Sequence, residues 1–128
     1  LDGVMECRAA NVFDLLPELE KAPKSYDFII LDPPAFTKSR KTIDSAMTGY
    51  KEINYRAMKL LPRGGYLATC SCSHFASTDR FIAMLRSAAH DAGVHLRQIE
   101  QRQQSCDHPI LWGVEETDYL KFFLFQVV

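Results

Sequence analysis

The sequence lacks the features that mark several common classes of protein. It contains no run of about 18 apolar residues that could span a bilayer, and it does not start with a basic stretch followed by an apolar one. Neither a membrane-spanning helix nor a secretory signal is therefore expected, and the cytoplasm is the expected compartment. The four cysteines form no Cys-x-x-Cys pair, so we expect free thiols, no disulfide framework and no metal site.

An excess of positive charge is also missing. The formal net charge of −1 provides no global attraction to nucleic acid, which proteins usually grip through clustered Lys and Arg. Any contact with RNA must then be local or lie outside this chain. The dense basic segment Lys38-Ser39-Arg40-Lys41 has two interpretations, a solvated loop or a contact with phosphate.

What is present indicates one domain, or part of one, because 128 residues with 47% hydrophobic content bury a single core of ordinary size. Apolar strand-like segments alternate with amphipathic helical ones. The sequence predicts strands at residues 26–31, 66–70, 96–100 and 119–128, and helices from about Gly49 to Leu61 and from Ser77 or Asp79 to just before Gly93. This alternation predicts an α/β fold with a parallel sheet.

The segments outside these predicted elements give weaker signals. Residues 5–9 are a candidate strand and residues 12–19 a candidate short helix. The predicted strand at residues 26–31 is a short apolar run apart from Asp27 and does not alternate polar and apolar residues, which predicts a strand that is buried on both faces. Residues 101–118 show no period, and so long a connection in a compact domain is usually functional or disordered.

Two unusual segments follow predicted strands, and ligands of open α/β sheets bind beyond the carboxyl ends of strands. The first is Asp32-Pro33-Pro34-Ala35-Phe36 and the second is Cys70-Ser71-Cys72-Ser73-His74. If the two strands are neighbours, Asp32 and Cys72 face one crevice. A carboxylate and a thiol in one crevice indicate covalent chemistry with acid–base help.

Each of these residues also has an ordinary structural interpretation. Asp32 could form a turn or cap a helix, although two following prolines, which have no N–H to be capped, argue against this. Cys72 could be a small buried residue. Cys70 lies deeper on the same face of the strand and is expected to pack against the covering helix. His74 and His108 could act as bases or bind phosphate, but a lone loop histidine more often does neither.

Five segments carry a resemblance to a known family. They are LDPPAF (residues 31–36), GYKEIN (49–54), GGYLATCSCS (64–73), DHP (107–109) and YLK (119–121). In order and spacing, from about Asn11 onward, they resemble the ribosomal RNA large-subunit methyltransferase I family of class I, Rossmann-like enzymes that use S-adenosylmethionine. Asp-Pro-Pro is shared with amino-group methyltransferases, whereas the second and third segments are more specific.

The resemblance implies methylation of cytosine C5 in 23S ribosomal RNA through a covalent cysteine adduct. Aligned from Gly64-Gly65, the family's nucleophile falls on Cys72 and not on Cys70. Asp32 would hold the cytosine ring at N3 and N4, and Asn11 would contact the adenine of the cofactor, unless it is a simple turn residue. The implied contacts are Pro33, Pro34, Phe36 and Lys38 with the RNA substrate, and Asn11, Asp32 and Pro33 with S-adenosylmethionine.

The sequence departs from the family's pattern at two places. Ala35 stands where many RNA cytosine methyltransferases have a second cysteine that aids product release, and where this subfamily often has a lysine. None of the six glycines forms a Gly-x-Gly loop, so the loop that cradles the cofactor, with an acidic residue for its ribose, is expected before Leu1. We therefore expect a C-terminal portion of a methyltransferase domain, in which strand 26–31 is an edge that could pair in a homodimer.

Two other functions remain open at this point. An amino-group methyltransferase acting on adenine or guanine would use residues 32–36 to orient the target amine, with Phe36 stacked on the base, and would need no thiol. A non-catalytic RNA-binding module would keep the fold and lack the cofactor site.

Overall fold

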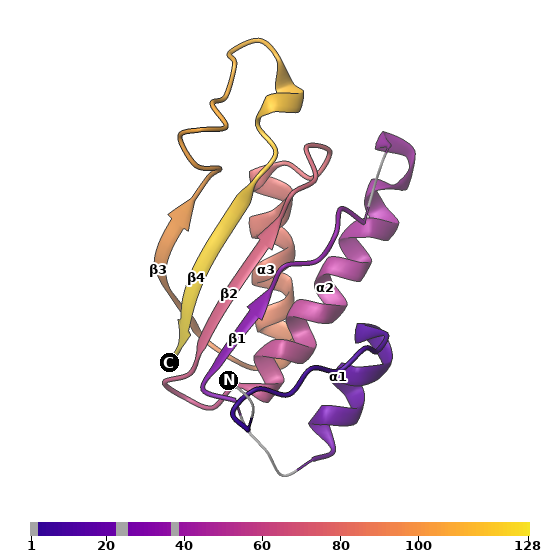
Figure 1. Cartoon of the computed structure of the whole chain (residues 1–128), viewed down its shortest axis with the longest axis vertical. Helices are drawn as coiled ribbons and strands as arrows, with labels where there is room; N and C mark the ends of the chain where they lie inside the picture. Colours follow the sequence, from indigo (N-terminus) through magenta and orange to yellow (C-terminus); the bar gives the residue numbers. More distant parts are fainter. Residues whose placement is uncertain (1–2, 23–25, 37–38) are drawn as a thin grey trace.

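A computed structural model describes residues 3–22, 26–36 and 39–128 of the chain (Figure 1). In these ranges the chain forms helices α1 (Val12–Glu20), α2 (Ile43–Leu60) and α3 (Thr78–Ala92), strands β1 (Phe28–Leu31), β2 (Tyr66–Ser71), β3 (Leu96–Arg102) and β4 (Lys121–Val127), and the 3₁₀ turns η1 (Arg40–Thr42) and η2 (Glu115–Thr117). No helix in the described ranges has both the length and the apolar character needed to cross a membrane.

The strands form one mixed sheet in the order β1-β2-β4-β3. β1 and β2 are parallel, but β4 lies between β2 and β3 and runs antiparallel to both. The predicted parallel sheet is therefore wrong for the second half of the chain. Residues 103–120 join β3 to β4 without a crossover α-helix, and two adjacent strands joined in this way run antiparallel.

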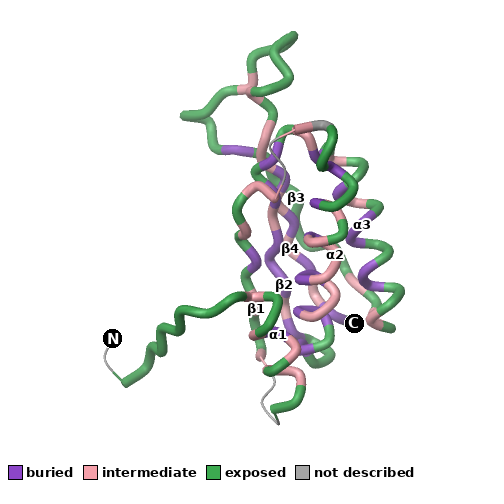
Figure 2. The backbone as a smooth tube through the Cα atoms, turned by 90° about the vertical axis from the view of Figure 1, so that its right-hand side faces the viewer, coloured by how far each residue is buried: buried purple, intermediate pink, exposed green. Residues whose placement is uncertain are grey.

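All three α-helices cover the same face of the sheet, which we call the covered face (Figure 2). Leu67, Thr69 and Ser71 of β2 are buried there, and the buried residues of β4 alternate in the same way. Aromatic rings fill the centre, since Phe81 of α3 lies 6.0 Å from Phe123, which stacks on Phe125 at 5.7 Å between centroids.

The opposite face, which we call the open face, carries no helix (Figure 2). Phe28 and Ile30 of β1 are 49% and 69% exposed, whereas Leu31 is buried. The prediction that this strand is buried on both faces is wrong. A continuous apolar run does not reveal which elements cover each face, and in this structure the helices cover only one.

The helix predictions are confirmed except at one boundary. Ser77 Oγ accepts a hydrogen bond from the Arg80 N–H (3.3 Å) at the start of α3, and Gly93 ends it with a left-handed φ of 68°. α1 forms as predicted, whereas residues 5–9 form no strand and are exposed. α2 begins at Ile43 and not near Gly49, because Ile43 and Ala46 extend its buried stripe toward the N-terminus.

Candidate active site

Three segments that are distant in the sequence meet near the carboxyl ends of β1 and β2. The parallel register pairs Leu31 with Thr69, so the residues that follow β1 lie beside the end of β2. The start of α1 joins them, because the rings of Phe13 and Phe36 are 5.9 Å apart. The predicted meeting of the segment after β1 with the segment that ends β2 is confirmed.

Asp32 and Cys70 are in direct contact at this edge. Cys70 Sγ lies 3.1 Å from Asp32 Oδ1 and 3.4 Å from the Leu31 carbonyl oxygen, and its thiol donates to these acceptors. Burial, followed by the hydrogen bond and charge of Asp32, raises the pKa of Cys70 to about 12. The thiol of Cys70 is therefore protonated at neutral pH.

The side chain of Cys70 does not pack against the helices, so that prediction is wrong. Thr69 and Ser71 point to the covered face and are fully buried, and alternation along β2 directs Cys70 to the open face. There it lines an open cavity of about 850 Å³ together with Asp32. The other lining residues come from β1, from the end of β3 and its following loop, and from the start of β4: Ile30, Arg102, Gln103, Gln104, Ser105, Cys106, Leu120 and Phe122.

The long loop after β3 forms one wall of this cavity. Gln104 is buried, its side-chain amide donates to the Thr117 carbonyl, and its oxygen accepts from the Leu120 N–H at 3.5 Å. These contacts fold the loop back toward β4. The sequence predicted only that the loop is functional or disordered, since its shape depends on these irregular contacts.

Cys72 lies one residue beyond β2 and is exposed, so the alternative that it is a small buried residue is wrong. It is not among the residues that line the cavity with Asp32. Cys70 thus takes the place beside Asp32 that the sequence predicted for Cys72. Cys72 lies at the margin of the same edge, with its thiol accessible.

Two buried side chains of α2 hold the site segments in place from the covered face. The Tyr50 hydroxyl oxygen accepts hydrogen bonds from Ser71 Oγ (3.0 Å) and from the Phe36 N–H (3.5 Å). Asn54 Nδ2 donates to the Tyr50 carbonyl and Asn54 Oδ1 accepts from Thr69 Oγ1, both at 2.8 Å. Burial is the main cause that raises the pKa of Tyr50. The segment GYKEIN therefore has a positioning role that the sequence alone did not reveal, although a polar Asn on an apolar helix face was a signal.

Lys121, the first residue of β4, is a second feature that the sequence did not predict. Its side chain is only 4% exposed, and Nζ donates to the carbonyl oxygens of Ser73 and Tyr119. Burial lowers the pKa of Lys121, while the charges of Asp118 and Cys72 act in the opposite direction. The alternation of residues along the strand could have indicated this burial, because Lys121 lies on the same face of β4 as Phe123 and Phe125.

The other predicted site residues are arranged as follows. Asn11 is the N-cap of α1, and its Oδ1 accepts from the Phe13 N–H at 3.0 Å. Phe36 packs against Tyr50, with ring centroids 4.7 Å apart. Pro33 is half-buried, Pro34 and His74 are exposed, His108 contacts Asp107 at 3.3 Å, and Lys38 lies outside the described residues.

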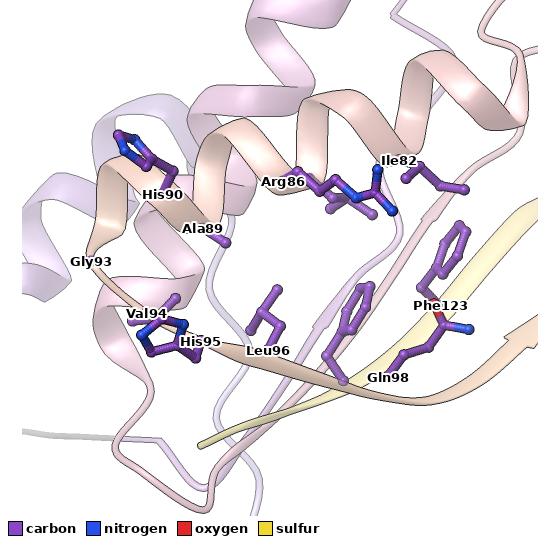
Figure 3. A pocket seen from close by; sticks show the side chains of 12 residues that line it. Ile82, Arg86, Ala89, His90, Gly93, Val94, His95, Leu96, Gln98 and Phe123 are labelled. Carbon is purple, nitrogen blue, oxygen red and sulfur yellow. The ribbon is translucent and has the colours of Figure 1, made fainter.

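A second cavity lies away from this edge, between α3 and the strands β3 and β4 (Figure 3). It measures about 590 Å³ and has an apolar lining that includes Leu85, Leu96 and Phe123, with Arg86 and His95 also among its lining residues. None of the predicted site residues that the structure describes contributes to it.

Comparison with known proteins supports the resemblance seen in the sequence. No protein-family model matches the chain. Two curated relatives are each named ribosomal RNA large subunit methyltransferase I: the protein of Cronobacter sakazakii is 40% identical and that of Erwinia tasmaniensis 42% identical, both over 118 residues or 92% of this chain. The chain spans 30% of the length of each relative.

A solved structure shows the same fold. It is described as a candidate methyltransferase in complex with SAH, and it superposes with a TM-score of 0.77 over 92% of this chain and 30% of its own, at 20% identity. The predicted fold class, part of a Rossmann-like class I methyltransferase sheet, is confirmed. Over 92% of its length this chain is similar to proteins named ribosomal RNA large subunit methyltransferase I.

Proposed function

We propose that this chain is the base-binding part of an S-adenosylmethionine-dependent enzyme that methylates cytosine C5 in 23S ribosomal RNA. The observation that carries the proposal is the meeting of Asp32, after β1, with the cysteine-bearing end of β2. A carboxylate can hold the polar edge of a cytosine there, and an exposed thiol, Cys72, lies close by on the same segment.

The residues assigned to the cofactor fit it in chemistry and place. Asn11 provides an exposed amide for an adenine ring, and Asp32 and Pro33 follow β1 on the segment that meets the start of α1 through Phe13 and Phe36. S-adenosylmethionine, when bound, supplies an electrophilic methyl group. The SAH in the structural neighbour supports this choice of cofactor.

Cys72 provides the covalent step, because C5 of cytosine is a poor nucleophile. The Cys72 thiolate adds to C6, forming a C–S bond and moving an electron pair toward C5, which would then take the methyl group from the bound cofactor and leave S-adenosylhomocysteine. A base next removes the C5 proton, the C5=C6 double bond re-forms, and the thiolate leaves. Asp32 accepts a hydrogen bond from the N4 amino group and stabilises the adduct through a proton held between its carboxyl group and N3, while Pro33 and Pro34 form a rigid wall for the ring.

Two features support Cys72 over Cys70 as the nucleophile. Cys70, with a pKa raised to about 12 by burial and by Asp32, has almost no thiolate at neutral pH. In addition, its sulfur touches the Asp32 carboxylate, so no ring fits between the two groups. Cys72 is exposed and makes no such contact with Asp32.

Methyl transfer to 23S ribosomal RNA by the whole protein tests the proposal. Cys72→Ala and Cys72→Ser should abolish turnover with cofactor binding kept, whereas Cys70→Ala should retain much of it. RNA carrying 5-fluorocytosine should trap an adduct on the peptide that contains Cys72, because fluorine cannot leave as a proton. An adduct on Cys70, or full turnover by Cys72→Ala, would overturn the assignment.

The same experiment tests an amino-group methyltransferase. That enzyme would turn over normally without Cys72, and its product would carry the methyl group on nitrogen. The packing of Phe36 against Tyr50 and Phe13 disfavours the stacking role that such an enzyme would need from Phe36.

A further inference from the structure

The position of Lys121 in the fold is unusual for a lysine. Lysine is among the residue types that are almost never fully buried, and burying an ammonium group is costly unless its protons find partners. Here the acceptors that the structure shows are two main-chain carbonyls, those of Ser73 and Tyr119. Both acceptors are neutral, so neither would offset the charge of a lysine ammonium group.

The first acceptor places Lys121 beside the proposed nucleophile. The Ser73 carbonyl follows Cys72 directly in the chain, where β2 has ended and the backbone turns toward α3. A hydrogen bond from Nζ to this carbonyl ties the turn to the start of β4, and the register pairs Ser71 with Lys121 across the two strands. The backbone that carries Cys72 is therefore held by the neighbouring strand.

An electrostatic interaction is a second connection between Lys121 and Cys72. Cys72 and Asp118 are the two negative or ionisable partners that raise the pKa of Lys121 against the effect of burial. Tyr50 and Cys70 are also close enough to interact with the charge of Cys72. Of these groups Lys121 is the one basic side chain, and a basic group beside a thiol favours the ionised form of that thiol.

We propose that Lys121 is a positioning residue that fixes the turn carrying Cys72 and stabilises the Cys72 thiolate. The catalytic meaning of this inference rests on the proposed function, in which Cys72 is the nucleophile. The reactivity of the Cys72 thiol can be measured on the full chain without any methyl transfer taking place.

The test is alkylation by iodoacetamide at pH 7, followed cysteine by cysteine with peptide mass spectrometry. Lys121→Met keeps the length of the side chain and removes its charge. It should slow alkylation of Cys72 by about tenfold, the effect of losing one nearby opposite charge, and leave the exposed Cys106 unchanged. Lys51→Met, which removes an exposed lysine paired with Asp91 at 2.6 Å, is the matched control and should change neither rate.

Cys70 reports whether a variant keeps its fold. Its thiol is half-buried and protonated in the native protein, so it should react slowly in every folded variant. An unchanged Cys72 rate in Lys121→Met with Cys70 still protected would overturn the proposal. A rise at Cys70 together with any change at Cys72 would show a merely structural role and would overturn it as well.

If Lys121→Met does not fold, a comparison of alkylation rates within the wild-type chain tests the proposal. Cys72 should then react several-fold faster at pH 7 than Cys106, which is also exposed, and equal rates would overturn the proposal. Failure of the proposed function is a separate result, since Cys72 could be activated by Lys121 and still be dispensable for methyl transfer in the whole protein.

Discussion

The two faces of the sheet differ in what they carry. The covered face holds a dry core in which the polar groups of Tyr50, Asn54 and Thr69 are hydrogen-bonded to one another or to the backbone. The open face carries Asp32 and Cys70 in a broad cavity. Neighbouring residues of β2 alternate between the two faces, so Cys70 on the open face is supported by the hydrogen bonds that Thr69 and Ser71 make on the covered face of the same strand.

The difference shows how an accessible site can be kept in place. Asp32 is exposed, and the hydrogen bond that the structure gives its side chain comes from Cys70. Its segment is anchored two ways, by pairing of β1 with β2 and by the Phe36 N–H on Tyr50. Rigid support placed on the covered face leaves the open face free for a ligand.

The largest expected difference between the faces is at two adjacent phenylalanines of β4. Phe123→Ala should lower the free energy of unfolding by about 3–5 kcal/mol, because it empties the aromatic centre of the covered face. Phe122→Ala, on the open face, should cost about 1 kcal/mol, since its ring is only half-buried. Urea unfolding of the two variants makes the comparison, and equal losses would mean that the faces are not distinct.

A buried amide on the covered face should matter nearly as much as an aromatic ring. Asn54→Ala leaves the Thr69 hydroxyl without its partner and opens a small cavity, so we expect a loss of about 2–3 kcal/mol in unfolding free energy. Asn11→Ala, at the exposed N-cap of α1, is the matched control and should cost about 1 kcal/mol. A double-mutant cycle with Thr69→Val should give a coupling of about 1 kcal/mol, and strict additivity would contradict the hydrogen bond.

An ion-paired carboxylate at the rim of the covered face, Glu20, adds a contribution to the free energy of unfolding that depends on pH. Burial alone would raise the pKa of Glu20, but Arg56 (3.0 Å) and Lys59 (3.2 Å) together hold it below its usual value. Because the folded pKa is lowered, the stabilisation is present above the unfolded pKa of about 4.3 and is lost as the pH falls through the folded pKa. Glu20→Gln should cost no more than about 1 kcal/mol at pH 7, since solvent screens the pair.

Thermal unfolding at several pH values measures this effect. The difference between wild type and Glu20→Gln should shrink below pH 4, whereas Glu18→Gln, at a carboxylate that is 72% exposed, should show little difference at any pH. A penalty for Glu20→Gln that grows as the pH falls would contradict the sign of the shift.

The smallest effect tests how the site segment packs on α2. A Cβ at Gly49 would lie 3.5 Å from the Phe36 ring and 3.6 Å from the Phe13 ring, which are ordinary contacts. Gly49→Ala should therefore stabilise the protein by about 0.5 kcal/mol through helix propensity. A loss of stability in calorimetry would show that Phe36 packs more tightly against the helix than the structure indicates.

The parts of the fold that the sequence predicted are those with local signals. Ser77 and Gly93 bound α3 through contacts within a few residues, and the apolar run of β2 ends at its own polar turn. The direction of β4 could not be predicted from a local pattern, because it depends on whether a helix crosses between β3 and β4. For the same reason the exposure of Ile30 was missed, since burial of a strand depends on what packs on each face.

In the candidate site, the sequence predicted which segments lie near one another but not which side chains are in contact. The rule that ligands bind beyond strand ends placed Asp32 near the cysteine segment. It could not tell which thiol turns to the open face, because that follows from the pairing of Cys70 with Phe122 and the burial of Thr69 and Ser71. The support from Tyr50 and Lys121 depends on tertiary contacts between residues 21 and 48 positions apart.

The central position of β4 also has a consequence for the order of folding. Ribosomes deliver a chain from its N-terminus, so β2 is made well before the strand that must lie beside it. Until β4 arrives, one long edge of β2 has unpaired backbone groups, and β3 has no described neighbour at all. The newly made chain therefore passes through a period in which it is prone to pair with other chains, and chaperone protection should matter most during that interval.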